Sequence, residues 1–330
     1  MRAAFYDTFG PPDVLTIGSI QEPELRAGDV LVQVVASGIN PSDVKRRAGW
    51  RNAAWAGRRI VAHCDGAGIV VAAGDEAGRP WIGRRVWIWS IPGRTFVRDG
   101  LEYGTAAEYV PVPVSHLAVL PDGTDFATGA CLGVPAITAH FTILADGPVA
   151  GQTVLVQAGG GAVGAIAVRI AREAGARVIA TVRSAERAAI AREAGADVVV
   201  DLTDTEAERQ VLGAAPGGVD RLIEVDFGAN VAFDARVIAT GGTIVSYSST
   251  SRPEPVIPYY ALQGKAVVIR LVSNYVLPPD RIREAVDHVE GLLERSVLRP
   301  KIVARHPLDD IAAAHRAVES GAIGKVVLDI

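Results

Sequence analysis

The sequence of 330 residues contains two cysteines, one methionine and no apolar run of the roughly 18 residues that a membrane helix needs. The cysteines, Cys64 and Cys131, are too few for a disulfide framework or a four-cysteine zinc lobe. Positive charge is not in excess, because 33 Lys and Arg residues are interspersed with 37 Asp and Glu residues. These absences argue against a membrane protein, a disulfide-stapled secreted domain and a nucleic-acid-binding protein.

The composition is that of an ordinary globular protein, with 49% hydrophobic and 21% charged residues. At a prior of about 150 residues per domain, this length predicts roughly two domains. The first residues, MRAAFYDT, are strand-like and lack the layout of a signal peptide. We therefore expect a soluble cytoplasmic protein that binds neither membranes nor nucleic acid.

The pattern of apolar and turn-forming residues changes twice along the chain. Residues 1–122 consist of short apolar runs separated by Gly and Pro, such as GDVLVQVVASG and GRRVWIWSIPG, which are typical of strands. Residues 123–276 alternate strand-like and helix-like segments, which predicts a doubly wound parallel sheet with helices on both faces. Residues 277–330 contain two amphipathic helices and a final strand, KVVLDI. The predicted fold class is α/β.

The strongest local motif is a glycine-rich turn between a strand and a helix, in which Gly159, Gly161 and Gly164 form the pattern G-x-G-x-x-G. The first glycine permits the tight turn, the second lets the backbone approach a pyrophosphate, and the third lets helix and strand pack closely. The N-terminus of the helix, at Ala162 and Val163, attracts the anion. The motif predicts a dinucleotide-binding site.

The end of the next strand favours NADP(H) over NAD(H). An acidic residue about 20 positions after the motif would bind the ribose 2′-hydroxyl of NAD, but residues 179–184 read IATVRS. Arg183 instead offers several N–H donors to a 2′-phosphate, and Ser184 and Arg187 can add to them. The alternative is that Arg183 is a solvated loop residue and Ser184 only the N-cap of a helix.

Two further features of the alternating region concern assembly and a helix boundary. Residues 266–272 predict a last, apolar strand of the sheet, and an unprotected edge of this kind invites pairing with a second chain. We therefore expect at least a homodimer. Thr203 and Glu206 fit a capping box at the start of a helix.

Several motifs occur in one order along nearly the whole chain. They are GINPSDVKRRAG at 38–49, DGAGIVVAAGD at 65–75, AAEYVPVP at 106–113, GVPAITAHFTIL at 133–144, the glycine-rich turn and the closing GAIGKVVLDI. With this set the sequence resembles the zinc-independent quinone oxidoreductase and zeta-crystallin branch of the medium-chain dehydrogenase/reductase superfamily. The resemblance implies a GroES-like, β-rich catalytic domain from residues 1–122 and 277–330. It also implies an inserted Rossmann NADP-binding domain from residues 123–276, with the active site in the cleft between the two.

The alcohol-dehydrogenase branch of that superfamily uses a catalytic zinc bound by two Cys and one His, and such a site needs three protein ligands. The matching positions here hold Asn40, Cys64 and Val134, of which only Cys64 is a metal ligand type. Asp65 beside it would at best be an auxiliary oxygen. We therefore expect no metal site. A quinone or an α,β-unsaturated carbonyl compound accepts a hydride without a metal Lewis acid, with NADP(H) as the cofactor.

The resemblance also implies roles for single residues. Asn40 is similar to an asparagine near the nicotinamide ribose, whose amide would bind a ribose hydroxyl or the substrate oxygen, although Asn-Pro is also a common turn pair. Thr138 is similar to a threonine that meets the nicotinamide carboxamide, and a hydroxyl bonded to its own helix is the alternative. Lys325 resembles a residue near the cofactor cleft or is a solvated lysine. The expected nicotinamide pocket adds Ser246, Tyr247, Ser248 and Asn274.

Departures from the family pattern concern the substrate. Quinone reductases of the family usually carry a tyrosine where this chain has Lys45 and another near Trp50, which argues against simple quinone reduction. Lys45 is a candidate to bind or protonate an enolate oxygen, with an exposed helix lysine as the alternative. Tyr247 is the third catalytic candidate, after Asn40 and Lys45.

Two functions of different classes remain open. The first is an NADPH-dependent, zinc-free oxidoreductase that acts on a small quinone or enone. The second is a non-catalytic NADPH-binding protein similar to a crystallin. An alcohol dehydrogenase is disfavoured by the missing zinc ligands.

Overall fold

The computed structural model describes residues 1–50, 57–90, 96–98 and 100–330 of the chain. It divides into two compact units, one made of Met1–Val134 with Val286–Ile330 and the other of Pro135–Ala285. The sequence analysis placed the divisions after residues 122 and 276 instead. Near the first division lies α2 (Phe126–Gly129), which packs against β3 and β5 of the first unit. Residues 123–134 therefore associate with the β-rich part of the chain.

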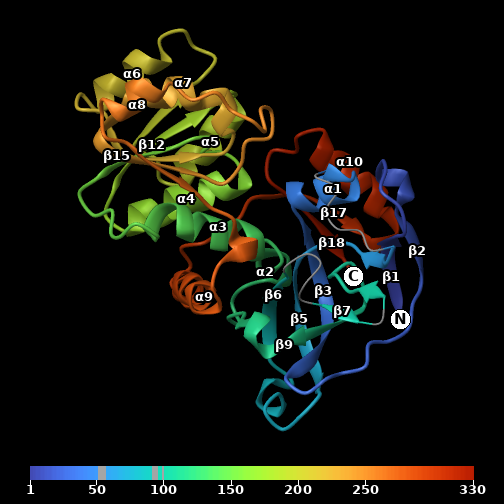
Figure 1. The fold of residues 1–330 in the computed structure, drawn as a ribbon. Helices are drawn as coiled ribbons and strands as arrows, with labels where there is room; N and C mark the ends of the chain where they lie inside the picture. Colours follow the sequence, from blue (N-terminus) through green and yellow to red (C-terminus); the bar gives the residue numbers. More distant parts are fainter. Residues whose placement is uncertain (51–56, 91–95, 99) are drawn as a thin grey trace. The chain divides into compact units, whose positions relative to one another are not determined.

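Two sheets form the β-rich first unit in the described part of the chain (Figure 1). One sheet has the strand order β2-β1-β4-β8-β7, and the other has the order β10-β6-β5-β3-β18-β17, with β9 paired to β3. The strands are β1 (Arg2–Tyr6), β2 (Thr16–Ser19), β3 (Asp29–Ile39), β4 (Arg59–Val61), β5 (Asp65–Ala73), β6 (Arg85–Trp89), β7 (Val97–Arg98), β8 (Leu101–Glu102), β9 (Tyr109–Pro113), β10 (Leu117–Val119), β17 (Ile302–Pro307) and β18 (Lys325–Asp329). The helices are α1 (Pro41–Arg47), α2 and α10 (Ile311–Glu319).

The last strand of the first unit, β18, pairs with an early strand, β3. β18 lies antiparallel to β3, with Val326 opposite Ile39. Alternate residues of β3, namely Val30, Val32 and Val34, are buried in one apolar cluster that also contains residues of β6 and β9. The period of two that the apolar runs show in the sequence therefore becomes one buried face of the sheet.

The second unit contains a parallel sheet of the order β13-β12-β11-β14-β15-β16, covered by helices (Figure 1). Its strands are β11 (Thr153–Val156), β12 (Arg177–Val182), β13 (Val198–Asp201), β14 (Val219–Glu224), β15 (Ile238–Ser246) and β16 (Val268–Leu271). Its helices are α4 (Ala162–Glu173), α5 (Ala185–Glu193), α6 (Ala207–Ala214), α7 (Phe227–Val237) and α8 (Tyr259–Gln263), while α3 (Gly133–Leu144) and α9 (Pro279–Glu294) cross the two divisions of the chain. The predicted parallel sheet is confirmed. Its strand order reverses between β11 and β14, where such sheets bind ligands at the carboxyl ends of their strands.

The capping box expected from Thr203 and Glu206 is wrong. α6 begins only after Glu206, and this residue caps the helix without a side-chain hydrogen bond. The main-chain N–H and the hydroxyl of Thr203 instead donate to a carboxylate oxygen of Asp201, at 2.9 and 2.8 Å. Asp201 ends β13 and closes the turn that follows it, so Thr203 is held by the strand and not by the helix.

No helix in the described ranges is both long and apolar enough to cross a membrane.

Candidate functional site

The glycine-rich turn joins β11 to α4 and leaves no room for side chains at two of its motif positions. A Cβ atom on Gly159 would lie 2.6 Å from the Cβ of Ala180 on β12. A Cβ atom on Gly164 would lie 2.2 Å from the main-chain oxygen of Ala158. Glycine at both positions therefore lets helix and strand approach each other, as the motif predicts. A Cβ atom on Gly161 would meet only the oxygen of Ala158, at 3.1 Å, within the described part of the chain.

The start of α4 fits an anionic ligand. Its N-cap is Gly161, which has no side chain to accept hydrogen bonds from the first turn. The first turn contains Ala162 and Val163, and its main-chain N–H groups point out of the helix toward any ligand above Gly161. The dipole of this 12-residue helix adds partial positive charge at the same place. The turn thus provides what the pyrophosphate of a dinucleotide requires.

Arg183 follows β12 directly and is exposed. Its Nη2 atom lies 3.5 Å from Oδ1 of Asn230 on α7, which is a long and weak hydrogen bond. Ser184 is the N-cap of α5, because its Oγ accepts from the main-chain N–H of Arg187 at 3.3 Å. Ser184 therefore fills the capping role that the sequence analysis considered as the alternative.

A carboxylate that sequence reasoning missed lies on the neighbouring strand. Asp201 ends β13 and is directly opposite Val182, the residue before Arg183. The hydrogen bonds from Thr203, together with the positive charge of Arg183, hold the pKa of Asp201 below its ordinary value. The sequence analysis looked for an acidic residue about 20 positions after the glycine-rich motif, which is the end of β12. That search could not find an acidic residue on the neighbouring strand.

The predicted nicotinamide-pocket residues lie at the carboxyl end of β15 and beyond β16. Ser246 ends β15, and its hydroxyl donates to the main-chain oxygen of Ser248 at 3.1 Å. The main-chain N–H of Tyr247 donates to the oxygen of Glu224, the last residue of β14, at 3.1 Å. Asn274 begins the short 3-10 turn Asn274–Val276 after β16. Because the sheet is parallel, these residues share its carboxyl edge with the glycine-rich turn.

Tyr247 keeps its phenolic proton at neutral pH. Burial and the charge of Glu224 raise the pKa of its hydroxyl above the ordinary value. The group is therefore a hydrogen-bond donor across the physiological range.

A buried polar network at the ends of β11, β12 and β14 was also missed by sequence reasoning. Gln157 donates from Nε2 to Oδ1 of Asp234 at 3.0 Å, and Asn230 donates from Nδ2 to Oε1 of Glu224 at 3.0 Å. Burial raises the pKa of both carboxyls, and the charge of Glu224 raises that of Asp234 further. Since Asn230 also faces Arg183, the network connects the interior of the sheet to the end of β12.

In the first unit, Asn40 lies between two buried charged groups. It is the N-cap of α1, and its main-chain N–H donates to Oδ2 of Asp43 at 2.8 Å. Its side-chain Nδ2 donates to Oδ2 of Asp65 at 2.7 Å, and its Oδ1 accepts from Nζ of Lys325 at 2.6 Å. Asn40 therefore has the position of the turn asparagine, and its buried amide also bonds both charged groups. Lys325 is 3% exposed, so the alternative of a solvated lysine is wrong.

Asp65 joins Asn40 to the start of α3. Its carboxylate accepts from the main-chain N–H of Val134, at 3.0 Å to Oδ1 and 2.9 Å to Oδ2. Burial raises the pKa of Asp65 to about 7, against the opposing effects of Lys325 and the Asn40 amide. The sequence analysis treated this residue only as a possible auxiliary ligand, because its partners lie far away in the chain.

The last two predicted residues occupy helices. Thr138 is buried on α3, and Lys45 lies half-buried on α1. The Nζ atom of Lys45 is 5.3 Å from the ring centroid of Trp50, a distance at which the cation is attracted to the ring face. Lys45 is therefore not simply a solvated helix lysine.

The positions that match zinc ligands form a hydrogen-bonded cluster of another kind. Asn40 and the N–H of Val134 both bind Asp65. Burial and the nearby carboxyls of Asp43 and Asp65 raise the pKa of Cys64 well above its ordinary value, so its thiol stays protonated. In the described ranges, no group of three or more His, Cys, Asp or Glu side chains is arranged to hold a metal ion.

The structure thus gathers the predicted residues within each unit. Asn40 and Lys325 are in contact in the first unit, which also contains Lys45. The second unit contains Thr138 and brings two groups of predicted residues to its sheet edge. The first group lies in the glycine-rich turn, the starts of α4 and α5 and the end of β12: Gly159, Gly161, Ala162, Val163, Gly164, Arg183, Ser184 and Arg187. The second group is expected to line the nicotinamide pocket: Ser246, Tyr247, Ser248 and Asn274.

Two family models match the chain. Residues 26–122 match the alcohol dehydrogenase GroES-like domain, and residues 162–291 match the zinc-binding dehydrogenase domain. The sequence is 28% identical to a human quinone oxidoreductase, with 99% of this chain and 97% of that protein covered. It is 31% identical to a chloroplastic NADPH-dependent alkenal/one oxidoreductase of Arabidopsis thaliana, with 99% of this chain and 79% of that protein covered.

The fold is also similar to solved structures. A native mycobacterial protein complexed with NADPH superposes with a TM-score of 0.85 at 26% identity, and each chain is covered completely.

Proposed function

The chain belongs to the quinone oxidoreductase branch of the medium-chain dehydrogenase/reductase superfamily, and on this basis we propose that it is an NADPH-dependent oxidoreductase of quinones or α,β-unsaturated carbonyl compounds. The observation that carries the proposal is the uncapped α4 N-terminus behind the glycine-rich turn, with Arg183 at the end of the next strand. When bound, a reduced nicotinamide cofactor supplies a hydride equivalent, which an electron-poor conjugated acceptor takes up without a metal.

The residues of the second unit would hold such a cofactor. The first turn of α4 would bind the pyrophosphate, and Arg183, with Ser184 and Arg187 beside it, would bind the 2′-phosphate. The segment from Ser246 to Ser248 and Asn274 would line the nicotinamide pocket.

The residues of the first unit would act on the substrate. Asn40 would hold the substrate oxygen or a ribose hydroxyl with its amide, which is already oriented by Asp65 and Lys325. Lys45 of the first unit and Tyr247 of the second are the candidates to deliver a proton to the enolate or quinol oxygen, since both carry a proton-bearing group that is only partly exposed.

Cofactor choice is predicted to depend on Arg183. Truncation in Arg183→Ala should weaken NADPH binding by about 1.5–3 kcal/mol, or about 10- to 160-fold, because a charge-assisted hydrogen bond to the 2′-phosphate is lost. NADH binding should change little. Fluorescence titration of both nucleotides measures the effect, with Arg192→Ala near the end of α5, the helix that follows Arg183, as the matched loss of one exposed positive charge. Equal affinity of the wild type for NADH and NADPH would contradict this assignment.

The activity itself is tested by NADPH consumption with a panel of quinones and enones. We expect turnover with at least one conjugated acceptor, and we expect it to survive exhaustive chelation because the matching ligand positions offer only one ligand type. Deuterium at C4 of the cofactor should appear at the β carbon of an enone. A fluorescence change with NADPH but no turnover across the panel would instead identify a nucleotide-binding protein without this activity.

We also propose that the chain forms a homodimer through the edge of the parallel sheet. In the described part of the chain β16 pairs with β15 alone, and its residues Val268 and Leu271 are 50% and 75% exposed. Tyr260 in the preceding helix is 83% exposed. Light scattering should give twice the 34.6 kDa of one chain, and Leu271→Asp should shift the protein toward single chains. Ile82→Asp, at an exposed apolar residue of the first unit, serves as the control, and a wild-type mass of one chain at micromolar concentration would refute the dimer.

A further inference from the structure

A buried lysine beside Asn40 requires explanation, because an ammonium group removed from water loses much of its hydration energy. Lys325 begins β18, and the register of β18 against β3 places it next to Asn40. Its Nζ atom donates to the main-chain oxygen of Ile39 at 3.0 Å and to Oδ1 of Asn40 at 2.6 Å. The contact with the amide is the shorter of the two.

The opposite side of the amide is equally constrained. Asp65 is fully buried, and its carboxylate accepts from Nδ2 of Asn40 and from the N–H of Val134. Its main-chain oxygen accepts from the hydroxyl of Thr105 at 2.7 Å. A Cβ atom on Gly133 would lie 2.2 Å from Oδ1 of Asp65, so glycine is needed there for the carboxylate to approach α3. Asp65 is therefore fixed through both its main chain and its side chain.

The two partners of Asn40 differ in hydrogen-bonding capacity. An ammonium group has donors only, and a carboxylate has acceptors only. An amide placed between them satisfies both in one orientation, with nitrogen toward Asp65 and oxygen toward Lys325. The flipped amide would place N–H against ammonium and oxygen against carboxylate, and both contacts would be repulsive.

We propose that Asp65 and Lys325 are positioning residues that lock the Asn40 carboxamide in one orientation for the reaction. In that orientation Oδ1 also accepts from the main-chain N–H of Asp43 in the capping box of α1, and one N–H of Nδ2 remains beyond the contact with Asp65. This N–H is the group that would meet the substrate oxygen or a ribose hydroxyl. The inference rests on the proposed function, because it assigns how Asn40 is prepared for that role.

The test compares Asp65→Asn, Lys325→Met and the variant that combines both changes. Each single variant should lower the urea midpoint of unfolding, because it leaves one buried charge without its partner. The combined variant removes both charges, and its urea midpoint of unfolding should return most of the way to the wild-type value. Its kcat with the best acceptor of the wild type should nevertheless remain at least about 30-fold below the wild-type value, because nothing then specifies the amide orientation.

A matched control removes a buried charge pair elsewhere in the first unit. Arg98 and Asp29 form an ion pair of 2.7 Å whose side chains are 12% and 5% exposed. Asp29→Asn combined with Arg98→Met should leave the kcat of the folded protein unchanged. Recovery of kcat together with the midpoint in the Asp65 and Lys325 combination would show that the pair serves stability alone and would overturn the inference.

A second measurement needs neither activity nor a variant at the charged positions. In protein labelled with 15N at asparagine, the side-chain signals of Asn40 are identified by their loss in Asn40→Ala. Both amide proton signals are expected to exchange with water much more slowly than those of exposed asparagine side chains. Exchange as rapid as at exposed asparagines would overturn the inference. A wild type without turnover on the acceptor panel would contradict the proposed function but would leave this measurement valid.

Discussion

Replacement of Asn40 by alanine is expected to lower kcat/KM with the best acceptor by about 30- to 900-fold, which corresponds to about 2–4 kcal/mol of transition-state stabilisation. The reason is that the amide is a preorganised donor, held at 2.7 Å by Asp65 and at 2.6 Å by Lys325 before any ligand arrives. Steady-state kinetics on the folded fraction of the variant measures the loss.

Asn40→Asp should be at least as harmful. It would place a second carboxyl beside the buried Asp65, and the two like charges would also oppose a developing enolate. Urea unfolding of both variants separates lost folding from lost chemistry. An Asn40→Ala protein with wild-type turnover would show that Asn40 only caps α1, and Tyr247 or Lys45 would then have to hold the substrate.

The second large effect concerns a buried histidine pair in the first unit. The Nε2 atoms of His63 and His315 are 2.9 Å apart, and Nδ1 of His63 lies 2.8 Å from the hydroxyl oxygen of Ser37. That oxygen is 2.7 Å from the hydroxyl of Thr105, which donates to the main-chain oxygen of Asp65. A carbonyl oxygen can only accept a hydrogen bond. Each group in this series of hydrogen bonds therefore donates to the next group on the side of Asp65.

This direction fixes the tautomers of both rings. His63 donates from Nδ1 to Ser37, and His315 donates from Nε2 to His63. Nδ1 of His315 is then an unprotonated nitrogen, and it is buried without a hydrogen-bond partner among the residues that the structure describes. His63 also has a φ of 73°, a left-handed conformation that costs a residue other than glycine free energy. The surrounding hydrogen bonds must compensate for this strain.

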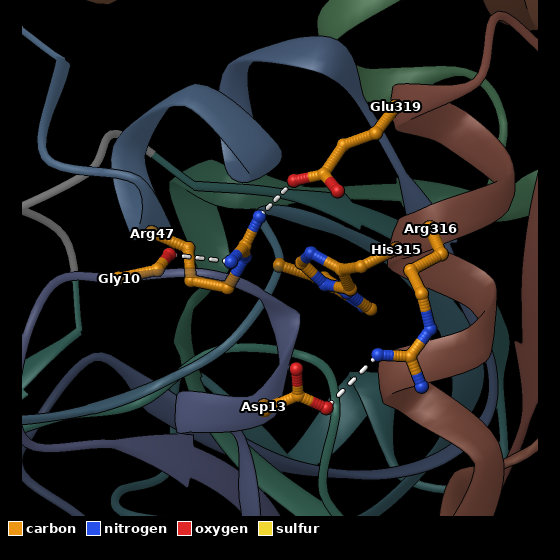
Figure 2. A network of polar contacts seen from close by, with 7 residues as sticks. Gly10, Asp13, Arg47, His315, Arg316 and Glu319 are labelled. Carbon is orange, nitrogen blue, oxygen red and sulfur yellow. Dashed lines mark hydrogen bonds and ion pairs between the residues drawn. The ribbon is translucent and has the colours of Figure 1, made fainter.

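Protonation of the pair is strongly opposed. Burial and, to a smaller extent, the positive charge of Arg47 together lower the pKa of His315 to about 3. Arg47 is itself buried on α1, donates to the main-chain oxygen of Gly10 at 2.5 Å and pairs with Glu319 on α10 (Figure 2). Burial likewise lowers the pKa of His63 well below its ordinary value.

The stability of the protein should therefore depend on His315 in a pH-dependent manner. An unfolded chain binds a proton at this histidine below about pH 6.5, whereas the folded chain does not until about pH 3, so falling pH favours unfolding across this window. In His315→Gln this linkage is absent. Relative to the variant, the wild type should lose about 1.4 kcal/mol of unfolding free energy per pH unit between about pH 6.5 and 4.5.

Urea unfolding at pH 7.0, 5.5 and 4.5 measures this difference. Near pH 7 the variant should be the less stable protein, because the hydrogen bond to His63 is altered, and its disadvantage should shrink or reverse in acid. Arg316→Gln is the control, since Arg316 neighbours His315 on α10 and bonds Asp13 at 2.9 Å (Figure 2). A pH-independent difference between wild type and His315→Gln would show that the histidine is not kept neutral by the fold.

Several features of the site follow from the sequence because they depend on neighbouring residues. The pattern of Gly159, Gly161 and Gly164 gave the turn, since the absence of a Cβ atom acts within the turn itself. Ser184 could be recognised as an N-cap because its partner, the N–H of Arg187, is three residues away. The expectation that no zinc binds required only an inventory of ligand types at Asn40, Cys64 and Val134.

Other local patterns were misleading where a nearby group competed for the same donor. The capping box at Thr203 is wrong because the main-chain N–H and the hydroxyl of Thr203 both donate to the carboxylate of Asp201. The sequence indeed has no acidic residue at the end of β12. The structure nevertheless places Asp201, the last residue of β13, near Arg183. Sequence spacing describes one strand, and the register between two strands decides which side chains share an edge.

What the sequence determined by itself is therefore the nucleotide-binding turn, the alternation that builds a parallel sheet and the missing zinc ligands, because each follows from residue type and local spacing. Only the tertiary structure decided the environment of Asn40. Lys325 is 285 residues away from it in the chain, and His63 and His315 are separated by 252 residues. These contacts depend on the antiparallel register of β18 against β3 and on the packing of α10, and they involve charged or titratable groups whose properties change when water is removed. No local pattern of residues encodes that desolvation.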